Sequence, residues 1–555
     1  MRFFTFLLAA LLFSSAAVAQ TGQTVVLRKL LIAPTDASAL AMRIDKGGDS
    51  RVVVQDVPLL AGADFLPVVL PFFGQPLSLE SVNAMASAIK QYGIKNDRLI
   101  NILVPDQPKE DVMLGVVRLT VIVNRYNELD FKGNRWFSSK LLRDKLGVRP
   151  GDEISIARLD EAVNWANTNP FRRVQVMLHP LDTRPGSTDL IIGVEERIPL
   201  RLLVSYDDSG NEILGKRHYT GSLQYGNFLG RDHQLSYQFS TSDHQGVFKA
   251  HSLNYQVPLP WRHRLDISAN YLLVNPSFLG GVFNQTGKNI GTDVRYTYPL
   301  RSGDNPVEVF GGLSYKQNNN NLAYGGFNFG GLVDVFQVAT GFSAIRRDKQ
   351  GAWALGLTLN LSPGRFNSRN TNDAFEGKNR ASFFNTGRVG ARAQYAYGLL
   401  SMQRVQNLQR GWQFLSRGTI QLSTANLVGS EQISIGGSST VRGFDERILT
   451  GDAGFVVSND LQAPPVRTKL AFITKKLPPL ESRFSVFYDA GHLRTTHPTA
   501  SDIPQYPLAS SGVGVRMNVG LNFNVSADYG WQITRLPDHY SSSRNRGHVK
   551  VVLAY

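Results

Sequence analysis

The sequence contains no cysteine among its 555 residues. This absence excludes a thiol nucleophile, Cys-ligated zinc, an iron–sulfur cluster, c-type haem and any disulfide framework. The histidines are scattered and none forms an H-E-x-x-H zinc motif. Complete phosphate-binding and dinucleotide-binding glycine motifs are missing, as is a G-x-S-x-G elbow. The sequence therefore indicates no catalytic residue, no metal site and no cofactor, and we do not expect an enzyme.

Long apolar runs are also missing beyond the N-terminus. Residues 3–12 form one such run behind Arg2, and Ala17-Val18-Ala19 supplies the small side chains that a signal peptidase accepts. Residues 1–20 are therefore predicted to be a secretory signal peptide. A short membrane anchor is the alternative, but the run has fewer than the about 18 apolar residues that a spanning helix needs. The exported chain is then either soluble outside the inner membrane or crosses a membrane as a β-barrel.

Residues 51–199 alternate helix-like and strand-like segments. Residues 77–92 place apolar side chains on one face at helical spacing, with Ser78 as a plausible N-cap. We expect two small α+β domains, at 51–125 and 126–199, each with a sheet covered on one face by helices. Residues 21–50 are treated as an N-terminal segment or linker. The other expected strands and helices are strands at 99–104, 116–123, 129–131, 173–179 and 189–195, and helices at 138–146 and 156–167.

After residue 200 strict alternation of apolar and polar residues replaces the helical spacing. Leu235, Tyr237 and Phe239, for example, alternate with serine and glutamine. A soluble β-sandwich also alternates, but its strands usually have about five or six residues. Here longer runs with aromatic residues near their ends are common, and membrane barrel strands need about nine to eleven residues with aromatic girdles. Residues 200–555 are therefore predicted to form a transmembrane antiparallel β-barrel of about 16 strands.

The lengths of the breaks between strands favour a defined orientation. Short breaks at 258–260 and 299–306 are typical of periplasmic turns, whereas longer polar stretches are typical of exterior loops. The final strand carries Val551, Leu553 and a terminal Tyr555, which resembles the C-terminal assembly signal of bacterial outer-membrane proteins. The stretches expected as exterior loops are 365–385, 425–451, 494–511 and 534–547.

The formal charge of +15 is unevenly distributed. Residues 1–199 carry a balance of +2 and residues 200–555 one of +13. A basic pore wall and loop arginines that meet anionic lipopolysaccharide are both consistent with this excess. Nucleic-acid binding is not expected, because no recognition motif is present. The arginines predicted on the polar side of barrel strands, facing the lumen, are Arg295, Arg388, Arg392 and Arg516.

The sharpest motif is Val441-Arg442-Gly443-Phe444, in a long loop that we place at 425–452. Downstream, Phe487, Asp489 and Gly491 share one face of a strand, because side chains alternate at period two. If the opposite face meets lipid, Asp489 points into the barrel, where a charge needs a partner. Arg442 at the tip of an inward-folded loop can supply that partner. The alternative is a surface arginine and a strand carboxylate paired with a nearby lysine.

These two motifs resemble the signature pair of outer-membrane translocases that carry POTRA domains. Within that superfamily the chain resembles the transporters of two-partner secretion, the TpsB or haemolysin activation/secretion family. The resemblance covers residues from about 51 to 555. Further segments that resemble the family are Pro105–Gly115 with its Pro-x-Gln, Asn169-Pro170-Phe171-Arg172, and Gly226-Asn227-x-x-Gly230-Arg231-Asp232.

The resemblance implies a 16-stranded barrel in the Gram-negative outer membrane, preceded by two periplasmic POTRA domains. Such a protein exports one large partner exoprotein without ATP, in an extended state. The implied partners are this TpsA-like exoprotein bound by the POTRA domains, outer-membrane lipid and lipopolysaccharide, and the outer-membrane assembly machinery; the chain itself is expected to be a monomer. The Arg442 loop would hold Asp489, brace the barrel and gate the conduit.

Some members of this family carry an N-terminal plug helix that closes the pore. The sequence does not decide whether this chain has such a helix. Residues 36–44 could form two helical turns. Two other functions remain. One is an outer-membrane insertase or assembly factor of the same superfamily, which usually carries more POTRA domains. The other is a diffusion porin, which has no need of residues 51–199, or a solute receptor, whose larger plugged barrel needs a longer chain. The partner could be an adhesin, a haemolysin or a contact-dependent toxin.

Overall fold

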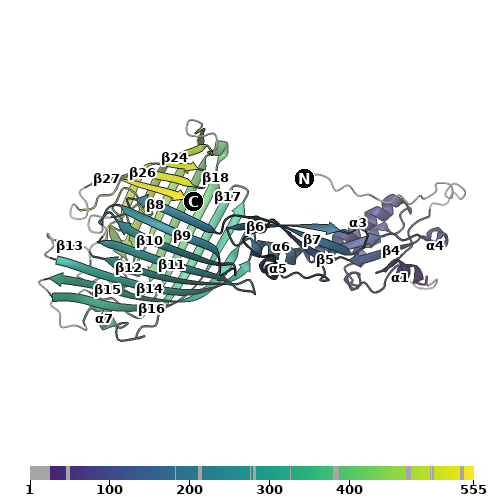
Figure 1. The fold of residues 1–555 in the computed structure, drawn as a ribbon, viewed down its shortest axis with the longest axis horizontal. Coiled ribbons are helices and arrows are strands. Elements are labelled where there is room, and N and C mark those ends of the chain that lie inside the picture. The colour runs from purple at the N-terminus through teal and green to yellow at the C-terminus, as the bar shows by residue number, and fades with distance from the viewer. Residues whose placement is uncertain are drawn as a thin grey trace. The chain divides into compact units, whose positions relative to one another are not determined.

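The computed structural model describes residues 25–44, 51–181, 183–210, 215–244, 246–275, 277–278, 283–324, 327–378, 387–470, 477–500, 502, 505–537 and 543–555 (Figure 1). The expected signal peptide lies outside these ranges. Within them, no helix combines the length and the apolar character needed to cross a membrane. The chain divides into two compact units, Met1–Gly133 with Leu146–Val163 and Val174–Val194, and Asn134–Lys145 with Asn164–Arg173 and Glu195–Tyr555.

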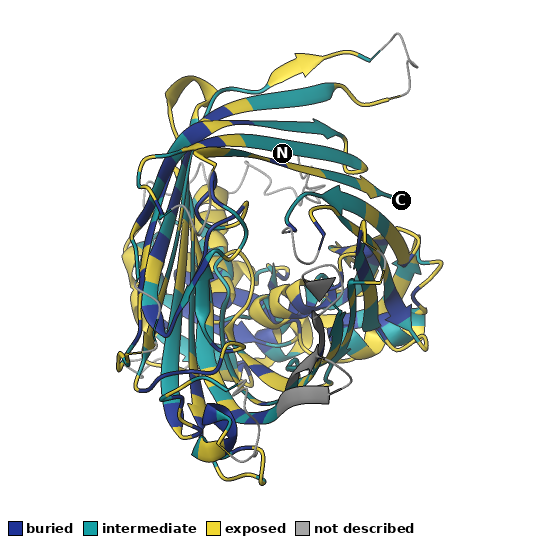
Figure 2. Cartoon of the chain, turned by 90° about the vertical axis from the view of Figure 1, so that its left-hand side faces the viewer, coloured by how far each residue is buried: buried dark blue, intermediate teal, exposed yellow. Residues whose placement is uncertain are grey.

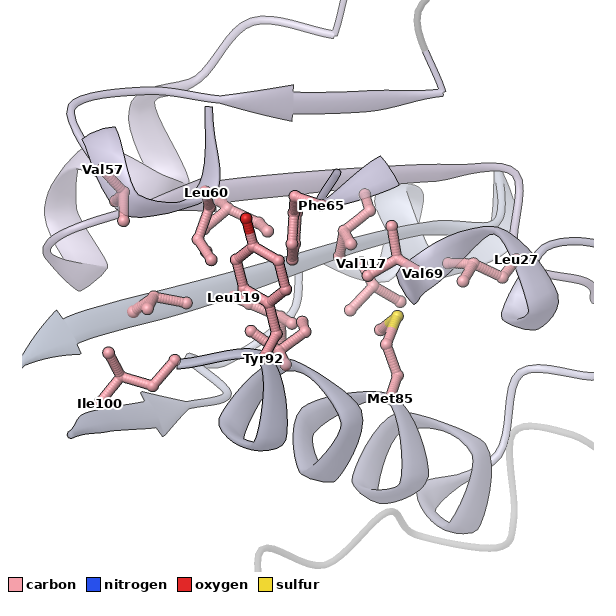
Figure 3. Close-up of a cluster of buried hydrophobic side chains, with 14 residues drawn as sticks. Leu27, Val57, Leu60, Phe65, Val69, Met85, Tyr92, Ile100, Val117 and Leu119 are labelled. Carbon is pink, nitrogen blue, oxygen red and sulfur yellow. The ribbon is translucent and has the colours of Figure 1, made fainter. Parts of the chain in front are cut away.

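The first α+β region contains a four-stranded sheet in the order β2-β1-β4-β3. Helix α3 (Leu79–Lys95) covers one face and starts where the sequence predicts, because the Ser78 hydroxyl accepts the N–H of Ser81. Figure 3 shows Met85 and Tyr92 of α3 pointing toward Val117 and Leu119 of the sheet. The strands are β1 (Lys29–Ala33), β2 (Val52–Val54), β3 (Ile100–Leu103) and β4 (Val116–Val123). The shorter helices are α1 (Asp36–Ala41), η1 (Pro58–Leu60), α2 (Leu66–Val69), η2 (Leu70–Phe72) and α4 (Lys109–Met113).

Strand β1 and helix α1 lie in the segment that the sequence analysis treats as a linker. β1 nevertheless pairs in parallel with both β2 and β4, and Leu30 and Ile32 are fully buried. Helix α1 covers the opposite face of this sheet, where the buried Arg118 guanidinium donates to the carbonyls of Ala39 and Met42. The apolar run of β1 is too short to show a period, which explains why the sequence pattern missed it.

The second α+β region has a three-stranded sheet in the order β5-β7-β6, with β5 parallel to β7. Its helices occur where helical spacing predicts them. The sheet and helices of this region are β5 (Arg125–Lys132), β6 (Arg172–Pro180), β7 (Ser187–Glu196), α5 (Ser139–Leu146) and α6 (Ile156–Ala166).

The remaining chain forms a closed barrel of 16 antiparallel strands, which confirms the predicted fold; two further short strands pair at its edge (Figures 1 and 2). The ladder from Leu203–Ala554 to Asp207–Lys550 closes the ring. The barrel strands are β8 (Leu200–Asp207), β9 (His218–Phe228), β10 (His233–Ser242), β11 (Phe248–Pro258), β12 (Arg264–Val274), β14 (Phe283–Arg301), β15 (Val307–Tyr324), β16 (Phe327–Asp348), β17 (Gly351–Ser362), β18 (Tyr395–Asn407), β19 (Gln413–Ser423), β22 (Ala453–Gln462), β24 (Leu480–Arg494), β25 (Leu508–Val519), β26 (Phe523–Gln532) and β27 (Asn545–Ala554), with the short β13 (Ser277–Phe278) and β23 (Val466–Thr468).

Two of the four arginines expected on barrel strands are not on strands. Arg388 and Arg392 precede β18, in a segment whose alternation predicted a strand. The apolar members of that segment, Ala391 and Ala393, are buried with Phe375 of the short helix α7 (Asn372–Glu376), so loop packing rather than a barrel face explains the alternation.

Asp97 links the two α+β regions. Its carboxylate accepts hydrogen bonds from the Ser155 hydroxyl and from the N–H of Ala157 at 2.7 Å, at the N-terminus of α6. The hydrogen bond from Ser155 lowers the pKa of Asp97, and the backbone N–H lowers it further. A carboxylate here satisfies helix-end donors and interacts favourably with the helix dipole.

We expect Asp97→Ala to lower the free energy of unfolding of the α+β regions by about 1 kcal/mol, the usual value of a helix cap. Because folding lowers the pKa of Asp97, this contribution is present above a pH of about 4 and is lost as the pH falls through the lowered value. Urea unfolding of the full chain, followed by helical circular dichroism, checks both effects. Asp160→Ala, on the exposed face of α6, is the control; equal effects of the two variants at neutral pH would contradict the capping role.

Candidate functional site: a loop anchored inside the barrel

The loop at 425–452 leaves the end of β19 and returns to β22. Its base is a small antiparallel hairpin of β20 (Ile433–Ile435) and β21 (Leu449–Gly451). Gly436 follows with a φ of 105°, and a Cβ there would lie 2.4 Å from the carbonyl oxygen of Asp445. Only glycine therefore fits this neck of the loop. The tip beyond the neck carries Val441, Arg442, Gly443 and Phe444, all buried.

Arg442 is the centre of the tip. Its Nε and Nη2 donate to the two carboxylate oxygens of Asp489 at 2.7 and 2.8 Å, and its backbone N–H also donates to Asp489. Nη1 donates to Asp460 at 2.8 Å, and Nη2 donates to the Ser458 hydroxyl. Arg442 is 3% exposed and Asp489 is fully buried. The structure thus brings together the arginine and the strand carboxylate that the sequence analysis singled out.

The carboxylates come from three different strands. Asp460 lies on β22, Asp489 on β24 and Asp528 on β26, and the last is 3.4 Å from Arg442. Arg516 of β25 donates twice to Asp528, which gives that carboxylate its own cation. Sequence reasoning missed Asp460 and Asp528, because neither stands in a motif of its own.

The wall is shaped to accept the loop tip. The guanidinium carbon of Arg442 lies 3.6 Å from the centre of the Phe487 ring, in a cation–π arrangement. Along the same register follow Gly512 and Gly530. A Cβ on Gly530 would lie 2.7 Å from the backbone nitrogen of Gly443, so the tip backbone fits against a wall that lacks side chains there. Gly491 lies further along β24, against Ile435 of the hairpin.

Apolar packing completes the seat of the tip. Phe444 and Val441 are fully buried in a cluster with Leu493, Leu508 and Leu536. Burial of a side chain such as phenylalanine contributes about 1.5–3 kcal/mol, so this cluster supports the ionic anchor.

A second anchor, which the sequence analysis missed, holds the base of the loop. The buried Glu431 accepts hydrogen bonds from Lys316 of β15 at 2.9 Å, Gln337 of β16 at 2.8 Å and Tyr397 of β18 at 3.0 Å. At the other end of the loop Asp452 is fully buried and accepts two hydrogen bonds from Arg388. Both acids lie outside any alternating pattern, so no signal in the sequence distinguishes them.

Two segments singled out by resemblance also meet. Asn169 donates to the carbonyl of Gly226 at 2.7 Å and to Asp232 at 2.8 Å, and Arg172 donates to both carboxylate oxygens of Asp232. Lys145 lies 2.5 Å from the same carboxylate. Burial lowers the pKa of Lys145, whereas the hydrogen bonds and charges of Arg172 and Lys145 outweigh burial and lower the pKa of Asp232. The cluster therefore fixes the turn between β9 and β10.

The C-terminal residues Val551, Leu553 and Tyr555 belong to the closing ladder or follow it. Val551 pairs with Tyr206 and Leu553 with Val204, and Tyr555 exchanges two backbone hydrogen bonds with Leu202. Leu553 is 53% exposed, on the outer face of the barrel. No group of acidic or histidine side chains in the described ranges is arranged to hold a metal ion.

We expect Arg442→Ala to release the loop tip. The substitution leaves Asp489 buried without its cation, which costs about 3–5 kcal/mol, and it leaves Asp460 with only the more distant Arg417, at 3.7 Å. Planar-bilayer conductance should rise and protease should cleave the loop, while a heat-dependent gel shift reports an intact barrel. Arg447→Ala, at an exposed arginine of the same loop, is the matched control. Wild-type conductance of a folded R442A barrel would contradict the anchor.

Gly530→Ala tests the seat without touching a charge. The new Cβ would meet the backbone of Gly443, so the tip should be displaced and the conductance should rise as for R442A. Gly418→Ala places a Cβ on β19 no closer than 3.9 Å to a neighbour, and it should behave as wild type. A G530A barrel with unchanged conductance and an uncleaved loop would show that the close approach is not required.

Known proteins resemble this chain in sequence. A family model for haemolysin secretion/activation proteins, ShlB/FhaC/HecB, matches residues 186–517. The chain is 22% identical over 411 residues to the outer membrane transporter CdiB of Dickeya dadantii (strain 3937), which covers 73% of this chain and 70% of that protein. It is also 22% identical to an outer membrane transporter CdiB of Escherichia coli, with 74% and 68% covered.

Solved structures share the fold. CdiB from Escherichia coli superimposes with a TM-score of 0.71 at 18% identity, covering 97% of this chain and 92% of that one. BamA from Haemophilus ducreyi lacking POTRA domains 1-3 gives a TM-score of 0.53 at 15% identity, covering 92% and 99%. The family match covers more than half of the sequence and contains the Arg442 loop together with Asp489. The chain therefore belongs to the haemolysin secretion/activation protein family, ShlB/FhaC/HecB, the transporters of two-partner secretion.

Proposed function

We propose that this protein exports one large partner exoprotein from the periplasm to the cell surface, through the barrel and without ATP. The observation that carries the proposal is a closed barrel whose interior holds a loop anchored on Arg442, in a chain of the two-partner secretion family. A loop fastened by buried ion pairs inside a pore is suited to controlling passage rather than to free diffusion.

The lengths of the connections support the orientation. The connections 229–232, 259–263 and 349–350 are short, and they are at the end of the barrel where β8 begins. The long connections 363–394 and 424–452 are at the other end. Outer-membrane barrels have short periplasmic turns and longer exterior loops. The α+β regions, which precede β8 directly, would then lie in the periplasm as POTRA domains.

The α+β regions offer sheet edges for an unfolded partner. β2 and β3 are the edges of the first sheet, and β5 and β6 those of the second. An extended segment that adds to such an edge gains backbone hydrogen bonds that do not depend on sequence, while adjacent side chains supply selectivity. Folding of the exported chain outside the cell would make transport one-way without a nucleotide.

The outer face of the barrel determines the proposed contacts with the membrane and with other proteins. We propose that the barrel acts as a monomer, that its apolar face meets lipid and its exterior arginines meet lipopolysaccharide, and that the strand ending in Leu553 and Tyr555 is read by the outer-membrane assembly machinery. Each barrel strand finds its partners within this one chain, so a single copy completes the barrel.

We expect export to be reconstituted from the transporter, the exoprotein and a lipid bilayer alone. A large exported protein whose gene adjoins the transporter gene serves as the candidate exoprotein. It is added unfolded to the outside of liposomes that contain the transporter, and protease protection measures uptake. Uptake should require the protein and should proceed without ATP; liposomes with a diffusion porin are the control. A strict ATP requirement would exclude the proposal. A fall in many outer-membrane proteins after deletion of the gene, with the exoprotein still exported, would favour an insertase.

A further inference from the structure

One side of the barrel interior is covered and the other is open. On β16, β22 and β24 the inward side chains of Gln337, Asp460 and Asp489 are at most 1% exposed. On β10, β11 and β12 the inward side chains of Gln238, Asn254 and Asn270 are exposed. In the described part of the chain, the side-chain hydrogen bonds and ion pairs of loop 425–452 to barrel strands end on β15, β16, β18, β19, β22, β24, β26 and β27.

The strand register identifies which side chains point inward. Leu223, Tyr237 and Leu253 are paired neighbours on β9, β10 and β11, and each is about two-fifths exposed, as expected of a face that meets lipid. Alternate residues of the same strands therefore face the interior. The same rule holds across the barrel, where the exposed Val486 and Tyr488 flank the inward Phe487.

Eight of the inward side chains of β9 to β12 form two rows of one chemical kind, and the neighbouring inward positions include Asp266 on one side and Leu272 on the other. The register aligns Ser222, Gln238, Ser252 and Asn270 in the first row. The second row consists of Gln224, Ser236, Asn254 and Ser268. All eight are uncharged and polar, and all are exposed or half-buried. We call these two rows the neutral track.

Most charges next to the neutral track have partners of their own, but Asp293 of β14 contacts the track itself, because the Ser268 hydroxyl donates to it at 3.3 Å. At the short-turn end, Arg264 donates to Asp266 at 2.9 Å and lies 3.4 Å from Glu308, so this cluster has its own counter-charges. On β14 the guanidinium of Arg295 lies over the ring of Phe310. The track therefore runs beside one carboxylate, Asp293, that Ser268 binds, and otherwise beside charges that have partners.

We propose that the neutral track is the surface along which an extended polypeptide moves while the loop keeps its place on the opposite wall. This inference rests on the proposed export function and adds the route and its chemistry. Serine, asparagine and glutamine both donate and accept, so they can replace water around the N–H and C=O groups of any extended chain. The track thus binds the backbone of the partner, and this binding does not depend on the partner's side chains.

Uncharged groups on the track also allow the passing polypeptide to be released. A hydrogen bond between uncharged groups is nearly balanced by the water bonds it replaces, whereas bonds to a charged group are about twice as strong. Apolar wall residues would retain the apolar side chains of the passing chain. A conduit must bind weakly at many places, and a neutral polar wall meets that requirement.

Cysteine substitution tests the route, because the chain has no cysteine of its own. The candidate exoprotein of the liposome experiment is given one cysteine and a folded C-terminal domain that arrests it. It is expressed with the full-length transporter carrying Gln238→Cys or Asn254→Cys. Oxidation should yield a crosslink at both. Ser485→Cys, inward but buried on the loop side, and Leu253→Cys, on the lipid face, are the matched controls and should give none.

A second test changes the charge of the track, and its permeability readout does not depend on the exoprotein, whereas its export readout does. The double variant Gln238→Lys with Asn254→Lys should raise the Cl⁻/K⁺ permeability ratio in planar bilayers by at least about twofold and slow export by about tenfold, because charged wall groups hold the chain more tightly. The double variant Gln238→Asn with Asn254→Gln keeps the chemistry and should match wild type in both.

The outcomes separate the two proposals. Crosslinks at Ser485→Cys instead of Gln238→Cys, with export intact, would overturn the track and leave the export function standing. An unchanged permeability ratio in the lysine variant would likewise overturn it. If the wild-type transporter does not export the exoprotein while the lysine variant shifts the permeability ratio, the open half of the lumen stands and the export function fails.

Discussion

The burial of one guanidinium group determines the interior of this barrel. Arg442 has left water almost completely, and such a charge is tolerated only where acceptors surround it. Three strands must therefore be in register to present Asp460, Asp489 and Asp528 at one place, and the wall must lack side chains at Gly530 so that the tip can come close. The position of the loop, the strand pairing and the glycines are parts of one constraint.

The two sides of the lumen differ in chemistry for related reasons. The loop side uses charges and close packing, which hold a segment of the chain in one place. The neutral track on β9 to β12 uses uncharged groups that hold nothing strongly. Glu431 extends the charged side to β15, β16 and β18, so the loop is fastened at its base as well as at its tip. One wall of the barrel therefore holds the loop, and the opposite wall is left for the proposed passage of the exported chain.

The sequence predicts the barrel well because alternation at period two survives wherever one face meets lipid and the other water. The same rule put Asp489 inside. It could not find Asp460 and Asp528, because their meeting depends on how separate strands pair, and it could not find Glu431, which lies in a loop without a period. Strand β1 escaped notice because five residues are too few to show a pattern, although its partners β2 and β4 place it at the centre of a sheet.

The spread of the anchor residues over separate strands limits when the loop tip can dock. The three carboxylates that surround Arg442 stand on β22, β24 and β26. The pocket exists only once these strands and the β25 between them are paired, whichever of them forms first. Removal of water from the guanidinium therefore depends on pairing that is already complete, and docking of the tip follows the formation of this part of the barrel wall.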